Sequence, residues 1–104
     1  MEQGIIKVSV VDDHVLLREG LVGMINSFPD YSVISRADNG RQFVTQLESG
    51  LQPDIVLLDI NMPVMDGFDT SRWVQERLPE VKILALSMYD NESSVIRMIR
   101  NGAR

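Results

Sequence analysis

Short apolar runs alternate with helically spaced apolar positions along the chain. Four runs rich in branched residues predict strands buried on both faces, over residues 5–11, 31–37, 55–59 and 82–87. Between and after these runs, apolar residues three or four positions apart predict helices over 17–28, around 43–47, over 67–78 and over 93–101. Such alternation is typical of an α/β protein with right-handed crossovers, so we expect a parallel sheet covered by helices on both faces.

Local signals refine two of the predicted helices. Gly20 and Gly23 lie inside the first helix, where each costs about 1 kcal/mol relative to Ala, so we expect them to pack closely on the sheet. Asp66 is placed to cap the third helix. The face of that helix expected to point inward consists of Phe68, Val74 and Leu78.

Composition narrows the possible functions mainly by exclusion. A formal net charge of -5 argues against a nucleic-acid surface, because phosphate backbones are held by clustered Lys and Arg. The absence of cysteine excludes disulfides, thiolate zinc sites and cysteine nucleophiles. No stretch approaches the ~20 apolar residues of a membrane span. We therefore expect one compact, soluble, cytoplasmic domain without a membrane partner.

Carboxylates stand at the ends of two predicted strands. Asp12 and Asp13 follow the first strand, and Asp59 ends the third. If these strands are neighbours, the carboxylates meet where open α/β sheets bind ligands. Two carboxylates ~4 Å apart repel by about 4 kcal/mol at an effective dielectric of 20, and a divalent cation is the simplest partner. Oxygen ligands favour Mg²⁺ over zinc, although Asp12 and Asp13 could instead only cap the following helix.

Phosphoryl chemistry is the use that we expect for such a magnesium site. A carboxylate beside Mg²⁺ can attack a phosphoryl group, and Asp59 is the best candidate for that nucleophile. Ser87 closes the fourth predicted strand at the same sheet edge and offers a hydroxyl to the phosphoryl oxygens. A local hydrogen bond from Ser87 to the backbone is the alternative. We interpret His14 as a surface residue at the helix start and leave it out of the mechanism.

Several ordered motifs now indicate a family. The chain resembles the receiver domain of bacterial two-component response regulators over nearly all of its length. The resemblance rests on Val11-Asp12-Asp13-His14, Leu16-Leu17-Arg18-Glu19-Gly20-Leu21, Asp54-Ile55-Val56-Leu57-Leu58-Asp59, Met62-Pro63-Val64-Met65-Asp66-Gly67, Leu86-Ser87 and Asn101-Gly102-Ala103-Arg104. The first two motifs look most like the NarL/LuxR-type branch. The implied fold is a doubly wound, flavodoxin-like (CheY-like) parallel sheet with strand order 2-1-3-4.

The resemblance also implies roles for individual residues. Asp59 would be the phosphoacceptor, and Asp13 and Asp59 would bind Mg²⁺ directly. Asp12 would help through water, and Asn61 would contribute its backbone carbonyl. Ser87 would be the switch hydroxyl that turns towards the phosphoryl group. The implied partner is a sensor histidine kinase, and the domain would be a regulatory phosphoacceptor that switches transcription rather than an enzyme.

Departures from the family pattern carry expectations of their own. The family continues with a fifth strand, an invariant lysine and a fifth helix, whereas this chain stops at Arg104. Members of this branch usually carry a helix-turn-helix DNA-binding domain as well, so we read residues 1–104 as a C-terminally incomplete receiver domain. Lys7 and Lys82 are the only lysines, and both are expected far from the acidic strand ends. We therefore expect slow or absent phosphorylation, and self-association through the exposed edge of the fourth strand.

Two other classes of protein stay open at this point. A phosphatase of the haloacid-dehalogenase type also uses an aspartyl nucleophile and Mg²⁺, but its Asp-x-Asp motif would need an acid where this chain has Asn61. An interaction module that no longer accepts phosphate is the second alternative.

Overall fold

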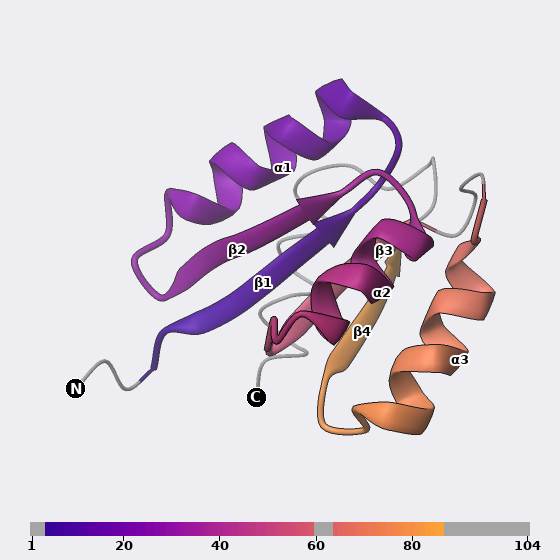
Figure 1. Cartoon of the computed structure of the whole chain (residues 1–104). Helices are drawn as coiled ribbons and strands as arrows, with labels where there is room; N and C mark the ends of the chain where they lie inside the picture. Colours follow the sequence, from indigo (N-terminus) through magenta and orange to yellow (C-terminus); the bar gives the residue numbers. More distant parts are fainter. Residues whose placement is uncertain (1–3, 60–63, 87–104) are drawn as a thin grey trace.

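A four-stranded parallel sheet with three helices is formed by residues 4–59 and 64–86, the residues that the computed structural model describes (Figure 1). The elements are β1 Ile6–Val11, α1 Val15–Asn26, β2 Tyr31–Ala37, α2 Gly40–Glu48, β3 Ile55–Asp59, α3 Gly67–Arg77 and β4 Lys82–Leu86. The strand order is β2-β1-β3-β4, which confirms the predicted topology. The helix expected over 93–101 lies outside the described residues. Among the helices of the described part, none is sufficiently long and apolar to cross a membrane.

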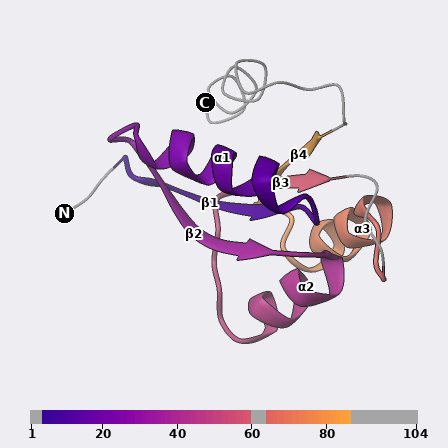
Figure 2. The same ribbon diagram turned by 90° about the horizontal axis from the view of Figure 1, so that it is seen from above.

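Side chains of the central strands divide between two cores because successive residues of a strand point to opposite faces. On one face, Val8, Val10 and Leu57 pack beneath α1 with Leu21 and Ile25. The other face is covered by α2 and α3, and its buried residues are Val11, Ala37, Phe43, Leu47, Val56, Leu58 and Val74. Figure 2 shows α1 on one side of the sheet and α2 and α3 on the other. All five residues of β3 are buried, as the continuous apolar run predicts.

The chain reverses its direction of travel across the sheet at β1. It leaves β1 through α1 to reach β2 on one side, and returns through α2 to reach β3 on the other side. A doubly wound sheet binds ligands outside the carboxyl ends of the strands at such a reversal. Val11 pairs with Leu58 in the parallel register, so the residues that follow them, Asp12 and Asp59, lie next to each other.

The expectation that Gly20 and Gly23 pack closely on the sheet is wrong. Both residues are exposed, and a Cβ atom added to Gly23 would meet no atom within 4 Å. The helix faces the sheet through Leu21, Val22 and Ile25 instead. The glycines therefore lie on the solvent side of α1.

The inward placement of Phe68 is also wrong, because this side chain is 67% exposed. Phe68 precedes Val74 by six residues, which separates the two side chains by about 120° around a helix of 3.6 residues per turn. The buried positions of α3 are Gly67, Thr70 and Val74, which follow helical spacing. Leu78 is half-buried and packs against the core as expected.

A close contact joins the start of α2 to the start of α3. A Cβ atom on Gly40 would overlap with Thr70 Oγ1 and lie 2.8 Å from the carbonyl oxygen of Met65. The Gly40 N–H also donates to that Met65 carbonyl, at 3.2 Å. Only glycine fits here, and the contact holds Met65, just before α3, against the start of α2.

Candidate metal centre

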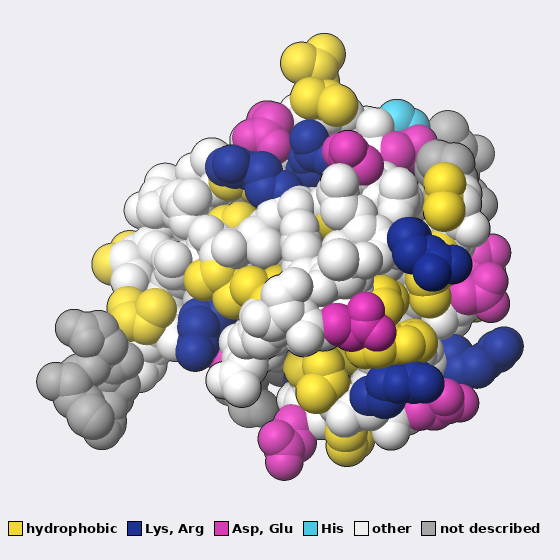
Figure 3. Space-filling model, viewed as in Figure 1, with side chains coloured by type: hydrophobic (Ala, Val, Ile, Leu, Met, Phe, Trp, Pro, Cys, Tyr) yellow, Lys and Arg dark blue, Asp and Glu magenta, His cyan; other side chains and the backbone are white. Residues whose placement is uncertain are grey.

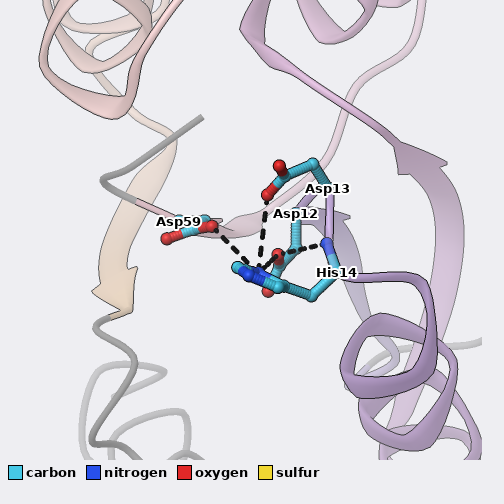
Figure 4. A group of neighbouring side chains, drawn as sticks. All are labelled: Asp12, Asp13, His14 and Asp59. Carbon is cyan, nitrogen blue, oxygen red and sulfur yellow. Dashed lines mark hydrogen bonds and ion pairs between the residues drawn. The ribbon is translucent and has the colours of Figure 1, made fainter. Parts of the chain in front are cut away.

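Three carboxylates and one imidazole meet at the carboxyl ends of β1 and β3. Asp12, Asp13 and His14 follow β1, and Asp59 ends β3. One possible ligand atom from each of these residues lies within 4.8 Å of the others (Figure 4). On the face shown in Figure 3, acidic side chains gather beside the histidine. The acidic strand ends meet as the sequence predicts, whereas Asn61 and Ser87 lie outside the described residues.

Backbone contacts hold the most buried carboxylate of the cluster. Asp12 is 1% exposed and Asp59 is 6% exposed, whereas Asp13 faces solvent. The Asp12 N–H donates to the Ala37 carbonyl at 3.0 Å, which ties the β1 end to β2. One Asp12 carboxylate oxygen accepts from the His14 N–H at 2.8 Å. Since His14 is itself the N-cap of α1, this bond is not the capping bond to N2 or N3 considered above.

His14 is exposed and lies at the start of α1, as we interpreted it, and its side chain also belongs to the cluster. Its Nδ1 lies 2.9 Å from Asp12 Oδ1, 3.5 Å from Asp13 Oδ1 and 3.6 Å from Asp59 Oδ2. The hydrogen bond to Asp12 and the negative charges of Asp12 and Asp13 raise the pKa of His14 above its ordinary value. The sequence signal that could have identified it is its place directly after the aspartate pair.

Arg18 is a second residue that pattern reasoning missed. Its Nη1 donates to the Asp12 carbonyl at 3.1 Å and also to the Asp38 carboxylate. The Asp12 backbone is therefore held at its N–H by Ala37 and at its carbonyl by Arg18. Since Asp38 follows β2, this guanidinium links the loops after β1 and β2 beside the metal centre.

The donor set of this cluster fits a hard divalent cation. Carboxylate oxygens are the ligands that Mg²⁺ takes at about 2.0–2.1 Å, and two ligands of one such ion lie at most about 4 Å apart. The 4.8 Å span of the cluster needs only a small closure to reach that spacing. A cation would also relieve the repulsion among the three carboxylates. The described residues are therefore suited to hold Mg²⁺ through Asp12, Asp13 and Asp59.

Both lysines of the chain lie at the opposite end of the sheet. Lys82 pairs with Ile55, the first residue of β3, which is about 13 Å of strand away from Asp59 at ~3.3 Å per residue. Lys7 is near the start of β1, where its backbone N–H donates to the Asp54 carboxylate at 2.8 Å. A hollow of ≈ 340 Å³ at this end includes Lys7, Asp54 and Glu80 in its lining and none of the cluster. Neither lysine therefore belongs to the acidic cluster, as the sequence predicts.

The comparisons with known proteins all indicate the same family. Residues 8–104 match the family described as response regulator receiver domain. The chain is 37% identical over 98 residues to the transcriptional regulatory protein DegU of Brevibacillus brevis, covering 94% of this chain and 41% of that protein. It is 37% identical over 94 residues to the nitrate/nitrite response regulator protein NarL of Escherichia coli K12, covering 90% and 43%. The chain thus spans less than half the length of these relatives.

Solved structures show the same similarity in three dimensions. The response regulator domain of Thermotoga maritima CheB aligns with a TM-score of 0.75 and 31% identity, covering 94% of this chain and 73% of that one. The signal receiver domain of a NarL response regulator from Mycobacterium tuberculosis aligns with a TM-score of 0.74 and 32% identity, covering 94% and 78%.

Proposed function

The chain belongs to the response regulator receiver domain family, in the branch of NarL and DegU, and we propose that Asp59 is the residue through which it performs the family's phosphoacceptor role. The observation that carries this proposal is the position of Asp59. Its carboxylate ends β3 at the reversal point of the sheet, within 4.8 Å of the other ligand atoms of the cluster. Because of this family membership, we propose the phosphoacceptor role in preference to a haloacid-dehalogenase-type phosphatase.

The step requires one bond to form and one to break. A carboxylate oxygen of Asp59 forms a bond to phosphorus while the P–N bond of a phosphohistidine donor breaks, and the leaving imidazole keeps the electron pair. Asp13 and Asp59 would hold Mg²⁺ directly, and Asp12 would hold it through water. Bound Mg²⁺ supplies positive charge next to the transferring phosphoryl oxygens. Turnover of a separate substrate is no part of this role, so we propose a regulatory phosphoacceptor and not an enzyme.

Two further contributions complete the proposed site. The backbone carbonyl of Asn61 would be a metal ligand, and the hydroxyl of Ser87 would turn towards the phosphoryl group. Both assignments come from the position of these residues in the family motifs.

Acetyl phosphate labelling tests the role of Asp59. The matched variants are Asp59→Asn and Asp30→Asn, which make the same chemical change at opposite ends of the sheet. We expect Mg²⁺-dependent labelling to be lost in Asp59→Asn and kept in Asp30→Asn. Labelling that persists in Asp59→Asn would mean that another group accepts the phosphoryl. The variants belong in a version that continues past Arg104, as the relatives do.

The position of the lysines predicts the rate of labelling. The family's lysine supplies a positive contact to the phosphoryl oxygens, and both lysines of these 104 residues lie at the far end of the sheet. We therefore propose that the chain ending at Arg104 is labelled much more slowly than the longer version. Equal rates would refute this.

A histidine kinase is the proposed partner, and exposed apolar side chains mark where it would dock. Val15 and Leu16 follow the cluster in the first turn of α1, and are 54% and 90% exposed. Val64 and Phe68 lie before and in the first turn of α3, and are 77% and 67% exposed. A change of Leu16 to Ser should slow transfer from phosphorylated kinases and leave labelling by acetyl phosphate unchanged. Slowing of both reactions would argue against docking at Leu16.

For the whole protein, we also propose a role in transcription and a cellular location. DegU is named a transcriptional regulatory protein, and this chain corresponds to 41% of its length. We propose that DNA is bound by a helix-turn-helix domain outside these residues, in a cytoplasmic protein. The sequence encoded after Arg104 tests this, since a continuation without such a domain would remove DNA binding from the account.

A further inference from the structure

We propose that His14 is a ligand of the metal centre for cations that accept imidazole, so that the centre binds Zn²⁺ through three carboxylates and one imidazole. This inference rests on the proposed function, since it extends the same metal centre. It concerns which cations the centre selects.

The position of the His14 ring is the first support. Figure 4 shows the imidazole among the three carboxylates, with Nδ1 2.9–3.6 Å from one oxygen of each. Two ligands of one cation with bonds of ~2.1 Å lie about 3 Å apart when adjacent and about 4 Å apart when opposite. The distances from Nδ1 fall within that range. One ion can therefore contact Nδ1 and the carboxylates with only small side-chain rotations.

Zn²⁺ and Mg²⁺ differ in their preference for nitrogen and oxygen ligands. Nδ1 interacts with Asp12 Oδ1, and in the tautomer with the proton on Nε2 the same nitrogen offers its lone pair to a metal. Mg²⁺ prefers oxygen ligands and keeps several waters, so it gains little from an imidazole. Zn²⁺ commonly takes His nitrogen together with carboxylate oxygen. His14 should therefore strengthen Zn²⁺ binding much more than Mg²⁺ binding.

His14 can also serve as a ligand without loss to the helix that it precedes. It is the N-cap residue of α1, yet its side chain makes no capping hydrogen bond. The side chain is 62% exposed, so a cation from solvent can reach the ring. The chain has one histidine and no cysteine, and any imidazole coordination must therefore come from His14.

Metal titration of the chain without a purification tag tests the inference. The affinities for Zn²⁺ and Mg²⁺ are measured by calorimetry in wild type, His14→Gln and Asp13→Asn. Loss of a metal ligand's outer hydrogen-bond partner typically costs 10–100-fold in affinity, and loss of the ligand itself should cost at least as much. We therefore expect the ratio of Zn²⁺ to Mg²⁺ affinity to fall at least about tenfold in His14→Gln. An unchanged ratio would overturn the inference.

Nuclear magnetic resonance of the single imidazole gives an independent measurement. Zn²⁺ should shift the Nδ1 resonance strongly, and Mg²⁺ should leave it close to its original position. No shift with Zn²⁺, or a shift centred on Nε2, would contradict ligation by Nδ1.

The two proposals fail in different ways. Asp13→Asn should weaken both cations, because Asp13 is a ligand in each case. If wild type binds Mg²⁺ but its Zn²⁺ affinity does not depend on His14, only the inference about His14 fails. If wild type binds neither cation, the proposed function fails with it.

Discussion

Val64 has the most unfavourable backbone conformation among the described non-glycine residues. Its φ of 71° lies in the left-handed region, and no other described non-glycine residue has a positive φ. That region is especially unfavourable for a β-branched side chain and costs about 1–3 kcal/mol. The side chain is 77% exposed, so burial offsets little of this cost. The strain lies in the segment that joins the Asp59 strand end to α3.

Replacement of Val64 by glycine should therefore stabilise the fold. We expect Val64→Gly to raise the free energy of unfolding by about 1 kcal/mol, because relief of strain exceeds the roughly 0.5–1 kcal/mol of added chain entropy. Val64→Ala keeps a Cβ atom at positive φ and should gain much less. Urea denaturation of both variants measures the difference. Equal stability of the two would show that the backbone at this position is not strained.

The same substitution should have opposite effects at two glycines. Gly40→Ala places a methyl group against Thr70 and the Met65 carbonyl, and overpacking of this kind costs about 1–3 kcal/mol. Gly23→Ala fills open space on the solvent side of α1 and should gain about 0.5–1 kcal/mol. Thermal unfolding of both variants checks the signs. Destabilisation by Gly23→Ala would contradict the exposed position of that residue.

At the scale of single elements, the Asp66 cap fixes the position at which α3 begins. The Asp66 carboxylate accepts from the Asp69 N–H at 2.9 Å, as the sequence predicts. Asp66→Ala should lower the free energy of unfolding by about 1 kcal/mol, and Asp66→Asn should keep most of the capping energy. Chemical denaturation compares the two variants. An equal loss in both would assign the effect to the charge instead of the capping bond.

Element boundaries were predictable where one signal determined them, and so were most inward-facing positions of the helices, such as Ile25, Phe43 and Val74. Asp66 and the apolar strand runs act through neighbours in the sequence, so their effects can be read locally. The faces of α1 and α3 depend on how each helix rotates against the sheet. The exposed Gly23 and Phe68 show that this rotation follows the best-packed residues, such as Ile25 and Val74, rather than every apolar position.

At the scale of the whole molecule, metal binding should stabilise the fold. A ligand that binds only the folded chain contributes about 2.7 kcal/mol when its concentration is a hundredfold above Kd. We expect Mg²⁺ to raise the melting temperature of wild type progressively with concentration. Asp13→Asn should lose this rise, because Asp13 is a proposed metal ligand and its side chain is exposed. A rise of equal size in the variant would place the Mg²⁺ effect elsewhere.

The outer strand β4 leads to a prediction about self-association. Within residues 4–59 and 64–86, β4 is an outermost strand, and its Ile83 and Leu84 are only half-buried. An outermost strand can pair with another chain, so we expect these 104 residues to self-associate as their concentration rises. Light scattering across a concentration series tests this. A monodisperse monomer at every concentration would contradict it.

The order and type of the described elements, the parallel sheet, and the acidic ends of β1 and β3 were predictable from the sequence. These features follow from short-range patterns, namely apolar runs, helical spacing and carboxylates that directly follow a strand. The position of His14 among the carboxylates and the hydrogen bond from Arg18 to the Asp12 backbone became evident from the folded structure. Those contacts depend on side-chain rotations and on the approach of separate loops, and neither leaves a periodic signal in the sequence.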